Sequence, residues 1–240
     1  MNKFTAMKQS KRKMHSAVWK AALGLIIFIV QIFLVSCWPA RVSLPPLPEK
    51  IERIEGYASI KITGEKGSTR SKVSFLLQLP HKGRIEIFGF LGKTICQIYI
   101  VDESSLFVIP SKKVYWQGDE EEVIYKFLGF RLNLYEMISL LSGKWEGEDG
   151  RDLWDLERDG ENRIIAGQRE DLRFEVREFF LNAPIARQLV FEHPLNSGRL
   201  NILDMVFNRI IKKGAFSLAF LKKYEQKSWA EIEKILSDED

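Results

Sequence analysis

The residues best suited to chemistry in this sequence are two cysteines, Cys37 and Cys96, and three histidines. His15 lies in a basic leader, and His81 and His193 each adjoin a proline, so no histidine or cysteine occurs at metal-ligand spacing. The sequence contains no Gly-x-Ser-x-Gly elbow, no phosphate-binding loop and no glycine-rich dinucleotide fingerprint. We therefore expect no enzyme activity, no metal and no cofactor.

The acidic residues fit a structural interpretation better than a catalytic one. The run from Asp119 to Glu122 is consecutive, and consecutive acids in one turn do not converge on one ion, so it predicts a helix start. Elsewhere acids alternate with apolar residues, as in Asp155 with Glu157 or in the segment around Glu175, which is typical of the solvated face of a strand.

Cys37 is preceded by a segment typical of an exported chain. Six Lys and Arg residues and no Asp or Glu occur before it, and an apolar run of 15 residues, Ala21 to Val35, is interrupted only by Gln31. A membrane-spanning helix needs about 20 apolar residues, so the run has the length of a signal-peptide core. The alternative is an uncleaved, slightly short transmembrane helix with Trp38 at the interface.

The four residues Leu34-Val35-Ser36-Cys37 resemble the bacterial lipobox. This resemblance implies a signal peptide of residues 1–36 and a covalent diacylglyceryl and acyl lipid on Cys37. Several chains on one residue anchor stably, because each buried methylene contributes about 0.8 kcal/mol. An Asp after the cysteine would resemble an inner-membrane retention signal, and Trp38 stands there instead. The resemblance thus implies a lipid-anchored protein on the outer membrane, facing the periplasm.

The remaining composition indicates one globular domain. Removing residues 1–36 takes away six positive charges, so the formal net charge changes from +4 to −2 and leaves no basic patch for nucleic acid. Residues 37–50 carry four prolines and predict a semi-rigid tether. Residues 51–240 are long enough for one sizeable core. In this domain Cys96 has no disulfide partner, and we expect it to be a small buried hydrophobe in a monomer.

From residue 51 the sequence alternates apolar and polar residues, as strands do. Connections of hairpin length rich in Gly, Pro, Asp and Ser separate the segments and predict an antiparallel meander. The strands are expected at 57–63, 72–79, 84–88, 95–101, 106–109, 153–158, 163–166, 172–179, 186–192, 199–207 and 216–224. Several of these carry apolar residues on both faces, so we expect both faces of part of the sheet to be covered.

Three helices are expected. The first follows the acidic run and ends at Gly129, the second spans Leu134 to Leu141 and ends at Ser142-Gly143, and the third covers 228–236 with Ser228 as its N-cap. The first two lie near the middle of the chain. The predicted fold is mainly β with inserted helices, a single antiparallel, unclosed β-barrel of about 10–11 strands with a helical lid.

Two stretches resemble the LolB family of outer-membrane lipoprotein receptors. Residues 84–94 resemble its strand, Asn-Pro-Leu-Gly-x-Thr hairpin and following strand, and residues 129–143 resemble its Gly-x-x-(Leu/Ile) helix start and Leu-x-Gly ending. The resemblance implies an unclosed barrel whose apolar cavity takes lipoprotein acyl chains from a periplasmic LolA-like carrier and delivers them to outer-membrane lipid. It extends over most of residues 51–240.

The hairpin Phe90-Leu91-Gly92 matches that family's insertion hairpin in part. Leu91 matches the leucine that protrudes into solvent or lipid and helps to release cargo, whereas Phe90 and Gly89 replace the proline and asparagine of the motif. An exposed apolar pair at a tip needs a partner. The alternative is that Phe90 and Leu91 fold back and close one end of the barrel.

The wall of the cavity is expected on the inward faces of the strands. The candidates are Phe75, Leu77, Leu79, Ile85, Ile87, Ile98, Ile100, Phe107 and Trp116. The alternative is that these residues form a solid core, which is the common fate of alternating apolar residues.

The expected function is that of an outer-membrane lipoprotein receptor, which accepts acyl chains reversibly and inserts lipoproteins into the membrane. The alternative is a structural or assembly lipoprotein of the envelope that binds a protein partner without lipid transfer. A continuous apolar pocket favours the receptor, and a solid core favours the alternative.

Overall fold

The computed structural model describes residues 43–65, 67–89, 91–102, 104–145 and 154–238. The chain from Val42 to Asp240 forms one compact unit, built on a single sheet of 12 strands. Cys37, Trp38 and Phe90 lie outside the described residues. The strands are β1 (Arg53–Gly64), β2 (Gly67–Gln78), β3 (Lys82–Phe88), β4 (Thr94–Val101), β5 (Ser104–Ile109), β6 (Val114–Gly118), β7 (Asp155–Arg158), β8 (Ile164–Arg169), β9 (Leu172–Phe179), β10 (Ala186–His193), β11 (Asn196–Phe207) and β12 (Glu225–Gln226).

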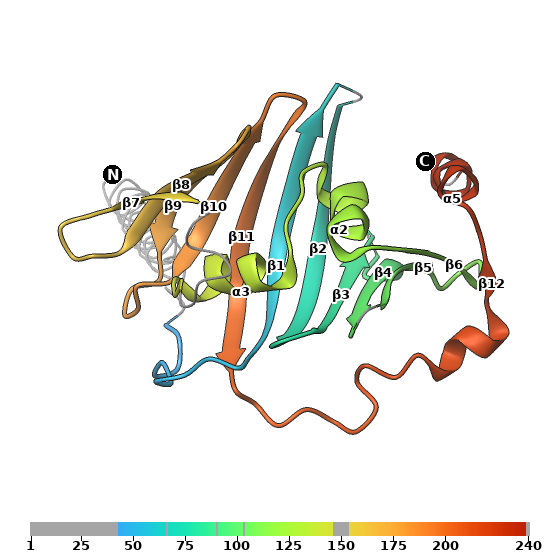
Figure 1. The fold of residues 1–240 in the computed structure, drawn as a ribbon, viewed down its shortest axis with the longest axis horizontal. Helices are drawn as coiled ribbons and strands as arrows, with labels where there is room; N and C mark the ends of the chain where they lie inside the picture. Colours follow the sequence, from blue (N-terminus) through green and yellow to red (C-terminus); the bar gives the residue numbers. More distant parts are fainter. Residues whose placement is uncertain (1–42, 66, 90, 103, 146–153, 239–240) are drawn as a thin grey trace, which may run out of the picture. The chain divides into compact units, whose positions relative to one another are not determined.

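The sheet consists of two antiparallel meanders joined where β1 pairs with β11 (Figure 1). Its order is β12-β6-β5-β4-β3-β2-β1-β11-β10-β9-β8-β7, and among the described residues only the short pairing of β12 with β6 is parallel. Strands β12 and β7 are the two edges and do not pair with each other, so the sheet is unclosed. The predicted single antiparallel, unclosed sheet is confirmed, with one or two more strands than expected.

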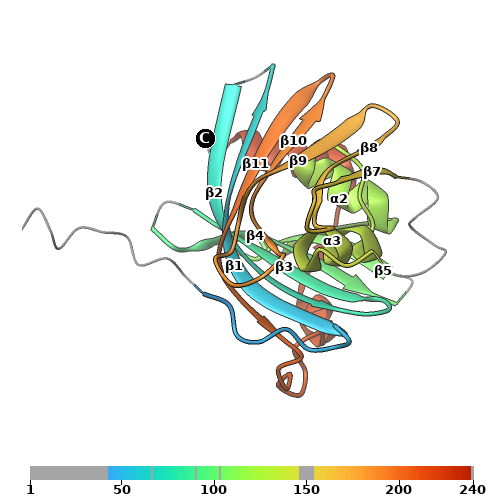
Figure 2. The ribbon, with the colours of Figure 1, turned by 90° about the vertical axis from the view of Figure 1, so that its left-hand side faces the viewer.

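Two central helices lie on the concave side of the curved sheet (Figure 2). Helix α2 (Glu120–Leu128) has Asp119 as its N-cap and ends at Gly129 with φ 78°, a conformation that glycine adopts without strain. Helix α3 (Leu134–Ser142) begins with a capping box and ends in the same way at Gly143. Both predicted helices are confirmed, because their start and stop signals are local.

Strands β4 and β5 are buried on both faces, as predicted, and the C-terminal segment supplies the cover. On the outer face Tyr99, Leu106 and Val108 pack against Leu218, Phe220, Leu221 and Tyr224. On the inner face helix α5 (Trp229–Ser237) places Trp229 against Phe107 and Trp116. The short strand β12 lies between these two covers along the edge of β6.

The predicted strand at 216–224 is wrong. The structure has a 3-10 helix there, η1 (Ala219–Lys223), followed by β12. Its apolar residues resemble strand alternation, but they recur at the three-residue spacing of a 3-10 helix and pack on the sheet from outside. Strand β6 was not predicted, because five residues after two lysines give too short a pattern.

The described part of the predicted tether is packed on the domain. Leu44 is 3% exposed, its N–H donates to Asn182 Oδ1 (3.1 Å), and its carbonyl accepts from Asn182 Nδ2 (2.9 Å). Lys144 Nζ donates to the carbonyls of Pro48 and Glu49. The part of this segment that is left to act as a tether therefore lies before Leu44.

Candidate functional site

An apolar cavity of about 90 Å³ lies between the two central helices and the sheet. Roughly 10–15 Å³ of such space holds one water-sized group, so the cavity takes a short stretch of an apolar chain. Its wall consists of Ile60, Ile62, Val73, Phe75, Leu77, Ile85, Ile124, Phe127, Leu128, Phe130, Leu132, Met137, Leu140, Leu141, Leu189, Phe191, Gly198, Arg199 and Leu200. Arg199 is exposed and is the only ionisable side chain among the described residues of this wall. The site therefore suits a hydrocarbon ligand.

Strand register brings the inward-facing side chains together. Phe75 pairs with Ile85 across β2 and β3, and Leu189 pairs with Leu200 across β10 and β11. Gly198 lies opposite Phe191, whose ring stacks on that of Phe130 with centroids 5.1 Å apart. Because Gly198 has no side chain, space remains beside this ring pair.

The cavity has an accessible side, where Ile62, Phe127, Leu128 and Leu200 are only partly buried. Ile62 and Leu200 lie toward the ends of β1 and β11 that are farther from the start of the domain, and Phe127 and Leu128 form the last turn of α2. Large apolar side chains left partly exposed around a cavity mark an entry for an apolar ligand.

The predicted wall coincides with the observed cavity only in part. Phe75, Leu77 and Ile85 line it. Leu79, Ile87, Ile98, Ile100, Phe107 and Trp116 belong to the same apolar core and are not among its wall residues. The wall on β10, β11 and the α2–α3 connection was not assigned from sequence. Met137 and Leu141 lie on the apolar face of α3, and the helical spacing of these residues is the signal that could have placed them.

The hairpin between β3 and β4 presents Leu91 to solvent. The leucine is 88% exposed, and Gly92 has φ +73° with nothing near an added Cβ, which is typical of a tight tip. The turn is closed by Gly89 N–H, which donates to Lys93 O (2.9 Å), and by Gly92 N–H, which donates to Gly89 O (3.0 Å). The alternative in which Leu91 folds back over the barrel is therefore wrong.

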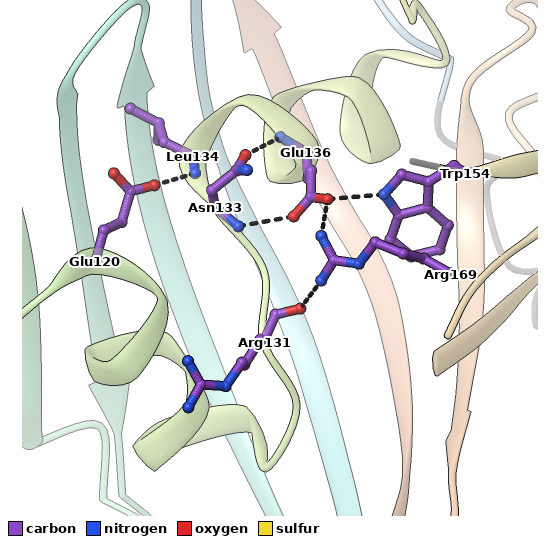
Figure 3. Close-up of polar contacts among 7 residues, drawn as sticks. All are labelled: Glu120, Arg131, Asn133, Leu134, Glu136, Trp154 and Arg169. Atoms are coloured by element: carbon purple, nitrogen blue, oxygen red, sulfur yellow. Dashed lines mark hydrogen bonds and ion pairs between the residues drawn. The ribbon is translucent and has the colours of Figure 1, made fainter. Parts of the chain in front are cut away.

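A buried polar network fastens α3 to the β8 side of the sheet (Figure 3). Glu136 is fully buried, forms an ion pair with Arg169, and accepts from Trp154 Nε1 (2.7 Å). The Arg169 guanidinium lies 5.2 Å from the centre of the Trp154 ring and donates to the carbonyl of Arg131 (2.7 Å). A buried carboxylate requires such partners, because an unpaired one is costly.

The same carboxylate also starts the helix. Glu136 Oε2 accepts from Asn133 N–H, and Asn133 Oδ1 accepts from Glu136 N–H, each at 2.9 Å. Nearby, Glu120 of α2 accepts from Leu134 N–H and so joins the two helices (Figure 3). Burial raises the pKa of Glu120, and the hydrogen bond from Leu134 opposes that rise in part.

No protein-family model matches the chain. A stretch of 102 residues, 42% of this chain, is 28% identical to part of the replication restart protein PriA of Borreliella burgdorferi and spans 14% of that protein. Among solved structures, the chain is similar to a LolA superfamily protein from Nitrosomonas europaea, with 12% identity, a TM-score of 0.49 and coverage of 73% of this chain and 94% of that one. It is also similar to a putative outer membrane lipoprotein-sorting protein domain from Vibrio parahaemolyticus, with 11% identity, a TM-score of 0.44 and coverage of 72% and 93%. At TM-scores below 0.5 these likenesses assign neither a family nor a function.

The described residues contain no group of three or more His, Cys, Asp or Glu side chains placed to hold a metal ion. None of the helices in the described part of the chain is long and apolar enough to cross a bilayer.

Proposed function

We propose that this chain is an outer-membrane lipoprotein receptor of the LolB type, which accepts lipoproteins by their acyl chains and inserts them into the membrane. In this proposal residues 1–36 are a signal peptide, Cys37 carries the lipid anchor, and the domain from residue 51 onward faces the periplasm. The donor is a LolA-like periplasmic carrier, and the acceptor is outer-membrane lipid.

The observation that carries the proposal is the apolar cavity with its partly exposed entry. Hydrocarbon binding needs only apolar walls, and each buried methylene contributes about 0.8 kcal/mol. A space of about 90 Å³ holds only part of an acyl chain. Longer chains require α2 or α3 to move away from the sheet, and the Glu136 network opposes that movement of α3.

The exposed Leu91 supports the delivery step. An 88% exposed leucine at a hairpin tip has no packing role, and transfer of its side chain into lipid is favourable. The alternative, a structural lipoprotein that binds a protein partner, predicts a filled core, so the cavity favours the receptor.

Binding is tested with residues 38–240, which omit the predicted anchor. A fluorescent acyl probe and one cargo protein, with and without its acyl chains, are titrated against this fragment. The expected result is saturable binding of the probe and of the acylated cargo only. Equal binding of both cargo forms, or of neither, would contradict the proposal.

Delivery is tested with Leu91→Glu. We expect normal folding and normal acyl-probe binding but slower transfer of cargo to vesicles, because a charged tip does not enter lipid. Leu203→Glu is the matched control, since Leu203 is 46% exposed on the strand β11. If both variants transfer cargo at the same rate, Leu91 has no special part in delivery.

A further inference from the structure

Besides Leu91, the domain has an exposed apolar and basic surface at the end where its N-terminal segment lies. It consists of Leu181, Arg209, Ile210, Lys212 and Lys213, and we call it the anchor-side surface. Ile210 is 89% exposed and Leu181 is 67% exposed, and all three cations are exposed. Figure 1 shows the blue N-terminal segment and the orange chain that leaves β11 at the same end of the sheet.

Hydrogen bonds fix the loop 209–214 beside the start of the domain. Asn208 Oδ1 accepts from the N–H groups of Glu52 (2.9 Å) and Arg53 (3.1 Å), and its Nδ2 donates to Lys50 O (2.7 Å). The far end is held by Arg84, whose Nη1 donates to Ala215 O (3.4 Å). Two backbone turns follow Ile210, in which Ala215 N–H donates to Lys212 O (3.1 Å) and Ser217 N–H donates to Gly214 O (2.9 Å).

Leu181 lies at the same end of the strands. It follows β9, next to Asn182, and Asn182 is the residue that holds Leu44 through two hydrogen bonds. The N-terminal segment therefore crosses this end of the domain with an exposed leucine beside it and an exposed isoleucine at the loop that Asn208 secures.

The chain segment that contains Ile210 carries charges of one sign, and the adjoining start of the domain adds the exposed acids Glu49 and Glu52. Residues 205–224 contain five Lys or Arg and no Asp or Glu. Arg209 has one described acidic neighbour, Glu55, at 4.0 Å with both side chains well exposed, which is a weak pair. A basic loop with an exposed aliphatic side chain has the composition of a contact with an anionic membrane surface.

The length of the N-terminal segment brings such a membrane within reach. Seven residues join Cys37 to Leu44, and seven extended residues span at most about 25 Å. An anchor at Cys37 therefore holds this end of the domain close to the lipid.

We propose that the anchor-side surface docks on the anionic face of the bilayer that holds Cys37, with Leu181 and Ile210 in the headgroup region and Arg209, Lys212 and Lys213 against lipid phosphates. This proposal rests on the lipid anchor of the proposed function and goes beyond it, because it fixes which end of the domain faces the membrane. The entry to the cavity lies toward the other ends of β1 and β11 and is left free for an incoming carrier.

The test is amide hydrogen exchange on the full chain, reconstituted into nanodiscs of phosphatidylcholine alone or with phosphatidylglycerol. We expect the anionic lipid to slow exchange in residues 209–214 and around Leu181, and to leave the β10–β11 turn unchanged. Each cation near an anionic surface contributes about fivefold in partitioning, so Lys212→Gln with Lys213→Gln should weaken the contact about 25-fold and remove the protection.

The matched control is Lys61→Gln with Arg70→Gln, which removes the same charge from the far part of β1 and β2, where these two residues pair. The proposal is overturned if exchange in 209–214 is the same in both lipids, if the control removes the protection as fully, or if the chain fails to co-purify with either nanodisc. Acyl-probe binding is measured on the same samples. Loss of probe binding with a protected loop rejects the receptor function alone, and an unprotected loop with normal probe binding rejects the docking alone.

Discussion

The two halves of the sheet stabilise their helices in different ways. In the packed half, β4, β5 and β6 with α5, aromatic side chains fill the space under the helix, and Trp229 lies 5.4 Å from the Phe107 ring and 5.0 Å from the Trp116 ring. In the cavity half, β1, β2, β10 and β11 with α3, a space of about 90 Å³ is left open. There a buried ion pair, Glu136 with Arg169, secures the start of the helix.

The difference shows what a helix over a cavity requires. Side chains that filled the space would stabilise the helix by packing and would exclude a ligand. Directional polar contacts at the rim, in contrast, leave the space free and still specify one position of α3. We therefore expect substitutions in the two halves to differ in both stability and ligand binding.

The largest effect is expected for Arg169→Ala, which leaves the Glu136 carboxylate buried without its cation. Removing one partner of a buried pair costs about 3–5 kcal/mol, and urea unfolding of residues 38–240 measures it. The control is Arg173→Ala, whose pair with Glu157 is exposed and 3.7 Å long, with an expected change below about 0.5 kcal/mol. Equal losses in the two variants would show that the network does not fasten α3.

The next largest effect is expected for Trp229→Ala in the packed half. Truncation of a fully buried tryptophan lowers the free energy of unfolding by about 3–5 kcal/mol. Because Trp229 is partly exposed, we expect a loss of about 2–3 kcal/mol. Its Nε1 has no hydrogen-bond partner among the described residues, so no hydrogen bond is lost, and the contact of Lys126 Nζ with the ring (5.1 Å) is removed with the side chain. Hydrogen exchange should rise in α5 and β12 and stay unchanged in β10 and β11. A uniform rise would mean that the two halves unfold as one.

Some features of the two halves are specified locally by the sequence, and others arise from tertiary packing. The helix caps at Asp119, Asn133 and Ser228 are local, since each side chain bonds to backbone three residues away. Most strands were recognised by alternation for the same reason. The sequences of β4 and β5 predicted that both of their faces are buried. They did not predict which segment buries the outer face, because η1 lies about 110 residues further along the chain.

The position of the cavity could not be read from alternation. Ile98 and Phe107 show the same alternation as Phe75 and Ile85, but only the second pair lines the cavity. The difference arises because Trp229 of α5 packs against Phe107, whereas Gly198 leaves space in the other half of the sheet. The contact of Arg169 with Glu136 joins residues 33 positions apart and has no sequence signal beyond the Asn133-x-x-Glu136 capping box. The exposure of Leu91, in contrast, was implied by the resemblance of its hairpin to the LolB family, whereas the residues alone left open that it folds back over the barrel.

Substitution of one buried valine in each half should affect the two halves differently. Val73 lines the cavity and Val114 lies in the packed half, and their exposures are 4% and 5%. Overpacking a filled core costs about 1–3 kcal/mol, so we expect that loss for Val114→Phe and less than about 1 kcal/mol for Val73→Phe. Val73→Phe should nevertheless abolish acyl-probe binding, because its ring enters the cavity. Normal probe binding by Val73→Phe would place the ligand elsewhere.

The smallest change leaves the sequence of residues 38–240 untouched and uses Cys96, the only cysteine of that fragment, as a reporter. Burial on β4 raises the pKa of its thiol to about 12, from 9.0 in the unfolded reference. Only the thiolate reacts, so the raised pKa and the burial of the thiol both slow alkylation of the folded chain at pH 8. Because the folded pKa is the higher one, the free energy of unfolding should decrease as the pH rises above about 9.

The alkylation rate therefore reports opening of the sheet around β4. Trp229→Ala should accelerate alkylation of Cys96 by more than its loss of global unfolding free energy accounts for, since α5 then packs less tightly on β5 and β6. Val73→Phe should leave it unchanged, because that substitution is confined to the cavity half. If both variants accelerate alkylation in proportion to their global stability alone, local opening does not occur and the halves are one cooperative unit. The different contacts that hold α3 and α5 on the sheet would then affect ligand binding and not local stability.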